Sequence, residues 1–355
     1  MAHHIFLIHG MGDFKDKWSQ NGDPSVQAQL KGFFKGYKDT APVADEFQIH
    51  EVNYNTVFEK WREIWKKNSS SAAAAATALG ISKGIASDLI KLAGAPVGDG
   101  LLRTHVLDVA LYRFCRQISD EVMLTVIDTV GKVYAGGSKT DPSFRYSLIA
   151  HSLGTVVAYE AFHANLSSKK PLPPASRPDN VFMIANTAAA LWQRGPDIYR
   201  PEVAPNLASD RGWCFKMANF GHRLDPVARL RPFDPPTAWF DPGMKDSTYL
   251  DVWLKETDVQ ELNVHSLSHY LGHPSVHIPI LRHLVSSNAI SKPVEEQAIE
   301  DWRKKRDDIF KHQAQQTLGA LLLKLSPNLI DQLALVQAFR ALALDSQSKS
   351  PDGDA

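Results

Sequence analysis

The stretch of chain from residue 145 to residue 164 constrains the fold more than any other part of this sequence. It begins with RYSLIA, a short run typical of a buried strand, and ends with a helical stretch at 155–164. The turn between them reads Ala150-His151-Ser152-Leu153-Gly154. Small residues two positions before and after Ser152 let a strand and a helix approach each other closely. We therefore predict a sharp strand-to-helix turn with Ser152 at its tip.

Other short apolar runs predict the remaining strands, and they are residues 5–8, 47–54, 181–184, 213–219 and 259–264. Residues 251–255 are expected to pair with the last run as a hairpin. Helical spacing over 26–37 separates the first two strands, so the chain opens strand–helix–strand. This order is typical of an α/β fold with a mostly parallel sheet flanked by helices.

The domain organisation follows from where helical patterns lie. We expect one α/β domain over residues 1–290, with a helical insertion at about 56–140 that either caps the site or packs as ordinary helices. Within it, the spacing of 107–134 predicts a long amphipathic helix ended by Gly136-Gly137. Residues 291–344 are predicted to form a C-terminal helical extension, and the polar tail 345–355 to be disordered.

Charge and cysteine content exclude several classes of protein. Lys+Arg and Asp+Glu are both 39, so the net charge is zero and no basic surplus favours nucleic acid. The two cysteines, Cys115 and Cys214, lie in apolar runs and are expected to be buried thiols. No secretory signal is recognisable, and no uncharged apolar stretch reaches about 18 residues. We expect no transmembrane segment and a cytoplasmic location.

A glycine-rich loop, His9-Gly10-Met11-Gly12, follows the first predicted strand. In acyl transfer, two backbone N–H groups must point at the developing oxyanion. One donor is expected from Leu153, directly after Ser152, and the other from the loop after an early strand. Met11 is the first candidate there and Gly10 the second. The alternative interpretation is an ordinary turn at the end of a strand.

An acidic residue follows the predicted strand 213–219. Asp225 stands in the sequence HRLDPV, where a carboxylate can orient a catalytic histidine and stabilise its imidazolium form. The alternative is that Asp225 only starts a turn before Pro226. The rival carboxylates lie in loops further from a strand end, and they are Asp210, Asp234 and Asp241.

A histidine follows the last predicted strand. His265 opens the segment HSLSHYL, and a loop after the final strand is where a general base is needed in such a fold. His269, four residues later, is the alternative base. Either choice gives the chain order Ser, Asp, His.

Histidines at spacing four also raise a metal-site interpretation, because two histidines at i and i+4 on a helix can chelate zinc. The series is His265, His269, His273 and His277. Gly272 and Pro274 are expected to break the helix before the third of them. No Glu stands between the first pair, as a metalloprotease motif requires. We therefore predict neither a metal nor an organic cofactor.

Taken together, HGMG, AHSLG, HRLDPV and HSLSHYL resemble the serine esterases and lipases of the α/β-hydrolase superfamily. The segment around Asp225 looks most like the class 3 lipases and related uncharacterised esterases. The resemblance covers about residues 3–285, and it implies the α/β-hydrolase fold with Ser152 as nucleophile, Asp225 as acid and His265 as base. Ala150 stands where such proteins usually carry glycine.

The expected activity is hydrolysis of a carboxylic ester through an acyl-enzyme, with a small-molecule ester or a lipid as substrate. Two alternatives remain open. The same residues serve an acyltransferase if the acceptor is an alcohol instead of water. The fold also supports a non-catalytic interaction protein, with a protein partner or self-association through the C-terminal helices.

Overall fold

The computed structural model describes residues 3–12, 14–22, 24–37, 47–67, 108–113, 115–166, 176–195, 197–208, 211–261, 263–285 and 290–316. The strands are β1 (His3–Ile8), β2 (Phe47–Val52), β3 (Tyr146–His151), β4 (Asn180–Ile184), β5 (Lys216–His222) and β6 (Tyr249–Leu254). The main helices are α1 (Val26–Lys35), α2 (Asn55–Lys67), α6 (Arg116–Thr140), α7 (Leu153–Leu166), α8 (Ala188–Leu191), α9 (Lys245–Thr248), α10 (Leu267–Gly272), α11 (Pro274–Leu284) and α12 (Lys292–Gln316).

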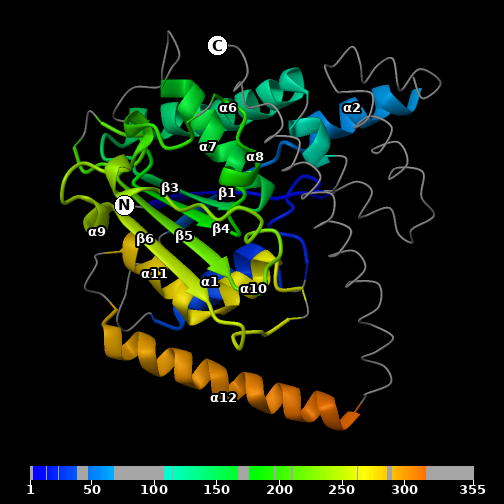
Figure 1. Cartoon of the computed structure of the whole chain (residues 1–355), viewed down its shortest axis with the longest axis vertical. Helices are drawn as coiled ribbons and strands as arrows, with labels where there is room; N and C mark the ends of the chain where they lie inside the picture. Colours follow the sequence, from blue (N-terminus) through cyan, green and yellow to red (C-terminus); the bar gives the residue numbers. More distant parts are fainter. Residues whose placement is uncertain are drawn as a thin grey trace, which may run out of the picture.

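The six strands form one sheet in the order β2-β1-β3-β4-β5-β6 (Figure 1). Every neighbouring pair is parallel. Parallel neighbours require crossover connections, which the helices between the strands provide. The chain therefore has an α/β fold, as the alternation of predicted strands and helices indicated.

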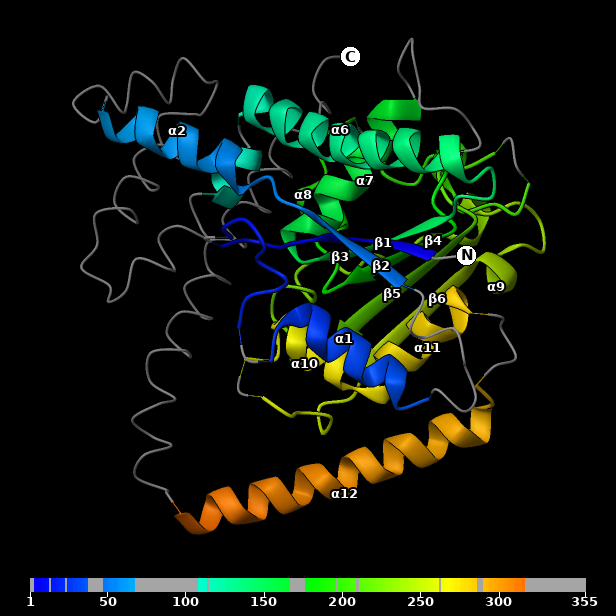
Figure 2. The same cartoon turned by 180° about the vertical axis from the view of Figure 1, so that it is seen from behind.

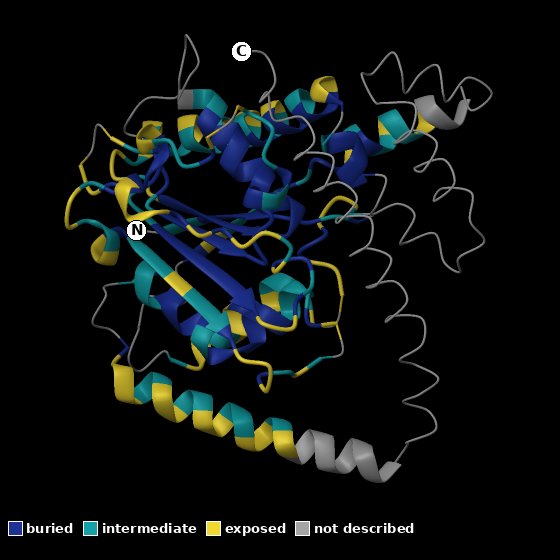
Figure 3. Cartoon of the chain, viewed as in Figure 1, coloured by how far each residue is buried: buried dark blue, intermediate teal, exposed yellow. Residues whose placement is uncertain are grey.

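Helices cover both faces of the sheet, so its central strands contain continuous buried apolar runs, such as residues 5–8 and 181–184. Phe6 and Leu148 point to the face covered by α6 and α7, while Ile5 and Ile149 point to the face covered by α1, α10 and α11. Figures 1 and 2 show these two helical layers on opposite sides of the sheet. In Figure 3 the central strands are buried throughout, whereas the edge strand β6 and helix α12 are partly exposed.

The strand order places two loops side by side at one edge of the sheet. From β1 the chain moves outward to β2, and it then returns to β3 on the other side of β1. In open α/β sheets, ligands bind beyond the carboxyl ends of the strands at such a change of direction. The register pairs Ile8 with Ala150, so the loop at Gly10 lies opposite the turn at Ser152.

The predicted hairpin is wrong. Residues 249–254 form β6, which pairs with β5 in parallel, and the described residues among 259–264, namely 259–261, 263 and 264, form no strand. The reason lies at Asp258, whose side chain accepts a hydrogen bond from the backbone N–H of Lys255 and whose own N–H bonds back to the Lys255 carbonyl. This tight turn ends the extended chain. Strand β5 also begins later than predicted, at Lys216.

The predicted helix end at Gly136-Gly137 is also wrong, because α6 continues to Thr140. Gly137 lies against the ring of Phe144, where an added Cβ would come within 2.2 Å of ring carbons. Glycine is thus needed for close packing there and does not terminate the helix.

Part of the predicted insertion and extension lies outside the described residues. Within 56–140, the structure describes α2, a short helix over 108–113 and α6, so the cap prediction falls largely on residues that it does not describe. Helix α12 begins at Lys292, close to the predicted start of the extension, and residues 317–355 lie outside the described part.

Cys115 and Cys214 are buried and unpaired, as predicted. Burial raises the pKa of the Cys115 thiol to about 12, so this side chain packs as a small apolar group. Within the described residues, no helix combines the length and the apolar character needed to span a bilayer.

Candidate active site

Ser152 lies in a strained backbone conformation at the tip of the turn between β3 and α7. Its φ is 54°, a left-handed value that non-glycine residues rarely adopt. Such strain costs on the order of 1–3 kcal/mol and persists only where the surroundings hold it. They do so here, since the Ser152 N–H bonds to the carbonyl of Ile184 and its carbonyl accepts the hydroxyls of Thr155 and Thr187.

Two glycines permit the close packing of this turn against the loop after β1. A Cβ on Gly154 would lie 2.3 Å from the carbonyl oxygen of His9, which leaves no room for a side chain. A Cβ on Gly10 would lie 2.8 Å from the Cβ of Ser152. The glycine-rich loop is therefore in direct contact with the serine, as two adjacent carboxyl-end loops should be.

Three side chains from distant parts of the chain form a continuous hydrogen-bonded row. The Nε2 atom of His265 lies 2.8 Å from Ser152 Oγ, and its Nδ1 atom lies 2.8 Å from Asp225 Oδ2. Ser152 and Asp225 are buried, while the side chain of His265 is 13% exposed. With Nδ1–H donating to the carboxylate, Nε2 is left as the atom that accepts the serine proton.

Asp225 is held as an acceptor of several hydrogen bonds just beyond β5. Its Oδ1 accepts the backbone N–H groups of Val227 and Ala228, and its Oδ2 accepts the hydroxyl of Tyr270 at 2.8 Å. Burial by itself would raise the pKa of Asp225, but the charge and hydrogen bond of His265 and the other donors outweigh it. The net result is a pKa below the ordinary value, which keeps the carboxylate ionised.

The residue before the serine fixes the histidine loop. His151 Nε2–H donates to the backbone carbonyl of His265 at 2.7 Å. Burial, followed by the charge of His265, lowers the pKa of His151 to about 3, so its ring stays neutral. The strand-to-helix turn thus holds the loop of His265 as well as the serine.

The glycine-rich loop is fixed from the end of β2. The Tyr54 hydroxyl donates to the carbonyl of His9 at 2.5 Å, and the His9 ring donates from Nδ1 to the Gly10 carbonyl. Met11 follows directly and is partly buried against the core. Leu153 is the first residue of α7, and N–H groups in a first helical turn have no acceptor within the helix.

His269, the alternative base, does not reach the serine. It is fully buried in α10, its ring lies 5.2 Å from that of His222, and neither ring nitrogen has a hydrogen-bond partner among the described residues. The structure therefore brings His265, and not His269, to Ser152 and Asp225.

The four regularly spaced histidines have separate surroundings. A break between α10 and α11, at His273, separates the first pair from the second, as Gly272 and Pro274 predicted. His273 caps α11 by accepting from the Ser275 N–H, and His277 donates to the Leu271 carbonyl. Among the described residues, no three or more His, Cys, Asp or Glu side chains are grouped to hold a metal ion.

Three residues that position this site were not predicted from the sequence. Tyr270 donates to the carboxylate, His151 donates to the histidine loop, and Tyr54 fixes the glycine-rich loop. Tyr270 lies in the segment HSLSHYL and His151 in AHSLG, and both segments were selected because of other residues in them. The positions beside Ser152 and His269 were thus the available signal, but each contact depends on the tertiary fold.

Comparisons with known proteins give no family. No family of known proteins and no curated protein matches this sequence. One similar solved structure, an uncharacterized protein from Pseudomonas aeruginosa, has a TM-score of 0.31 and 12% sequence identity. That match covers 90% of this chain and 51% of the other, so this chain spans about half the length of that protein.

Proposed function

We propose that this chain is a serine hydrolase of the α/β-hydrolase fold that cleaves carboxylic esters. The observation that carries the proposal is the hydrogen-bonded row of Ser152, His265 and Asp225, with spacings of 2.8 Å and 2.8 Å. A buried serine that merely stabilised the fold would need neither a strained φ of 54° nor a histidine backed by a carboxylate.

The location of the row supports the fold assignment within the α/β class. Ser152 follows the central strand β3, Asp225 lies just beyond β5, and His265 follows β6. The chain order Ser, Asp, His is the one found in α/β-hydrolases. A positive φ at the serine is also typical of their strand-to-helix turn, which exposes Oγ above the sheet.

In the first half of the reaction, Ser152 Oγ attacks the ester carbonyl while His265 Nε2 accepts the hydroxyl proton. The carbonyl oxygen becomes negatively charged, and the N–H groups of Met11 and Leu153 stabilise it. The tetrahedral intermediate collapses, the bond to the alcohol oxygen breaks, and His265 returns the proton to the leaving alcohol. An acyl-enzyme on Ser152 remains.

In the second half, water takes the place of the alcohol. His265 removes a proton from water as its oxygen attacks the acyl carbon, and the second intermediate collapses to release the carboxylic acid. The proton returns to Ser152 Oγ through His265. Asp225 stays ionised throughout and stabilises the transient imidazolium, in agreement with its lowered pKa.

A panel of p-nitrophenyl esters of increasing acyl length tests this function. We expect hydrolysis with burst kinetics by the native chain. The Ser152→Ala variant should lose several orders of magnitude in kcat with an unchanged circular dichroism spectrum. Equal rates for the two proteins, or no hydrolysis of any ester in the panel, would refute an esterase.

Transfer to an alcohol is separated from hydrolysis by the products. With a short alcohol added, a hydrolase still yields mainly free acid, whereas an acyltransferase yields mainly the new ester. Chromatography of the products of one reaction therefore decides between water and alcohol as the acceptor. The Ser152→Ala variant is the blank for both products.

A further inference from the structure

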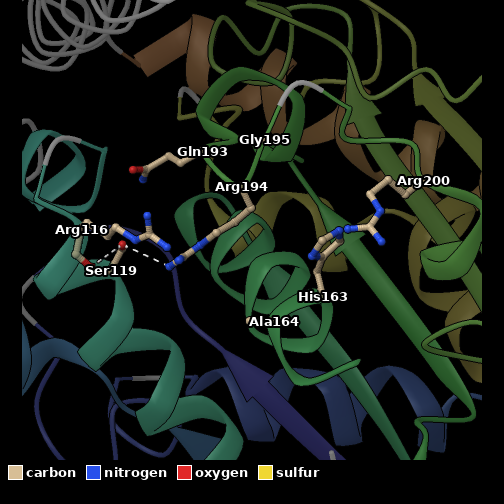
Figure 4. A pocket seen from close by; sticks show the side chains of 8 residues that line it. All are labelled: Arg116, Ser119, His163, Ala164, Gln193, Arg194, Gly195 and Arg200. Carbon is tan, nitrogen blue, oxygen red and sulfur yellow. Dashed lines mark hydrogen bonds between the residues drawn. The ribbon is translucent and has the colours of Figure 1, made fainter. Parts of the chain in front are cut away.

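A second feature of the molecule is a cavity of about 350 Å³ in the helical layer that covers one face of the sheet. It lies between the N-terminus of α6, the later part of α7 and the segment after α8 (Figure 4). Cavities that bind small molecules begin at about 300 Å³. The size is therefore sufficient for an organic ligand.

The charged side chains that line this cavity are all basic. Three are arginines, Arg116, Arg194 and Arg200, and His163 lies with them. Figure 4 shows Arg116 and Arg194 turned toward each other, and Arg200 beside His163. Among the described residues that line it none is acidic, so a ligand in the cavity meets guanidinium N–H groups from two sides. We call this cavity the arginine pocket.

The carboxylates that pair with these arginines are not among the described residues that line the cavity, and they are Asp120, Glu160 and Glu202. Asp120 contacts both Arg116 and Arg194, at 3.9 Å and 2.6 Å. Glu160 lies 3.7 Å from the Nε of Arg194 and is fully buried beneath it. Arg194 is itself only 14% exposed, so it is fixed in place before any ligand binds. Such preorganisation lowers the entropic cost of binding.

The N-terminus of α6 adds to the positive potential. The residue before it, Cys115, makes no side-chain capping hydrogen bond, and the first turn contains no acidic residue. Ser119, in that turn, lines the cavity together with Gln193. A helix of 25 residues thus directs the positive end of its dipole toward the arginines, and Asp120 in its second turn offsets part of this potential.

We propose that the arginine pocket binds a phosphate group carried by an organic molecule. Guanidinium groups match phosphate oxygens in paired hydrogen bonds, and three of them around one cavity favour phosphate over a neutral ligand. The cavity has room for more than an inorganic ion. The phosphate belongs either to a soluble ester or to a lipid headgroup, which share this chemistry.

The pocket is distinct from the serine site. His163 is the eleventh residue of α7, whose first residue follows Ser152 directly. At about 1.5 Å of rise per residue, the two lie roughly 16 Å apart along the helix. A bound phosphate therefore does not touch the reacting atoms, and its binding is measurable whether or not the chain hydrolyses esters.

Isothermal titration with pyrophosphate at constant ionic strength tests the pocket. The variant Arg116→Ala/Arg200→Ala removes two arginines whose side chains are 84% and 43% exposed, and it leaves the buried Arg194–Glu160 contact intact. The matched control is Arg211→Ala/Arg223→Ala, whose side chains are 65% and 58% exposed and also pair with one carboxylate each.

We expect saturable 1:1 binding by the native chain, a dissociation constant raised roughly tenfold or more in the pocket variant, and little change in the control. Burial and the charge of Arg200 lower the pKa of His163, so bound pyrophosphate should raise it, as seen by NMR titration. Absence of saturable binding, equal weakening in both variants, or an unmoved His163 would overturn the proposal.

Two further probes identify the source of the phosphate. Glycerol phosphate represents a soluble ester, and vesicles of phosphatidylcholine with or without phosphatidic acid represent a lipid surface. Binding of glycerol phosphate alone assigns a soluble ligand, and cosedimentation only with phosphatidic acid vesicles assigns a headgroup. Either result supports the proposed phosphate site if the Arg116→Ala/Arg200→Ala variant no longer binds that probe. The proposal is overturned if this variant binds the probe as well as the native chain does.

Discussion

Tyr270 offers a quantitative test of the carboxylate environment, because its hydroxyl donates to Asp225 Oδ2 at 2.8 Å in a fully buried site. Burial, followed by the charge of Asp225, raises the pKa of Tyr270 well above its usual value, so the hydroxyl remains a donor. Tyr270→Phe removes that donor without opening a path for water. A hydrogen bond to a charged group contributes about 1.5–3 kcal/mol, and we expect this loss in unfolding free energy at pH 7.

The loss should depend on pH in a defined direction. The pKa of Asp225 is lowered in the folded chain. The ionised carboxylate therefore stabilises the fold at pH values above the pKa of the unfolded chain, and this stabilisation is lost as the pH falls through the pKa of the folded chain. Tyr270→Phe raises the pKa of Asp225 in the folded chain, so the unfolding free energies of the variant and the native chain differ by the full amount at pH 7. The difference should shrink below about pH 4, the ordinary range of a carboxyl group.

The assay is urea unfolding at several pH values, with Tyr159→Phe as the matched control. The Tyr159 hydroxyl is also buried, but it donates to a neutral acceptor, the carbonyl of Ile198, at 2.7 Å. That variant should lose about 0.5–1.5 kcal/mol, with no dependence on pH. If Tyr270→Phe costs no more than Tyr159→Phe and its cost is flat with pH, the reasoning about Asp225 is wrong.

Four further substitutions test the packing and the site. Gly136→Ala should raise the unfolding free energy by about 0.5–1 kcal/mol, whereas Gly137→Ala should lower it. The reason is that only a Cβ at position 137 would meet the ring of Phe144. Thermal unfolding measures both changes. His269→Phe should keep kcat and unfold no more easily, because neither ring nitrogen has a partner among the described residues; loss of turnover would make His269 functional after all. Gly10→Ala should reduce kcat in the ester assay, because its Cβ would press on the serine; an unchanged kcat would contradict this contact.

The serine was predictable from sequence because its surroundings are local. The buried strand, the small residues and the helix that follow one another around Ser152 are all within 20 residues, and the structure has them as β3, the strained turn and α7. The neighbouring loop at Gly10 was predictable for the same reason, since it directly follows an apolar strand.

The last strand was not predictable from local pattern. Residues 249–254 and 259–264 both alternate in a way that suits a strand. Pairing with β5 selects the first of them, and the turn at Asp258 ends it. His265 nevertheless lies beside Ser152, because the loop that starts beyond β6 is long enough to reach back to the turn after β3.

The choice between the two histidines also required the tertiary structure. His265 and His269 occupy the same short segment, and nothing in their spacing distinguishes them. The difference arises because α10 begins at Leu267, capped by Ser266, and turns His269 into the core. The same helix directs Tyr270 to Asp225, a contact between residues 45 positions apart.

The central claim is that Ser152 is a nucleophile activated by His265, and covalent labelling tests it most directly. The native chain is treated with a fluorophosphonate, and the adduct is located by mass spectrometry of its peptides. We predict a single adduct on Ser152, none on Ser152→Ala, and labelling slowed by several orders of magnitude in His265→Ala, whereas His269→Phe labels as fast as the native chain. A native chain unlabelled at Ser152, or labelled equally fast without His265, would contradict the account.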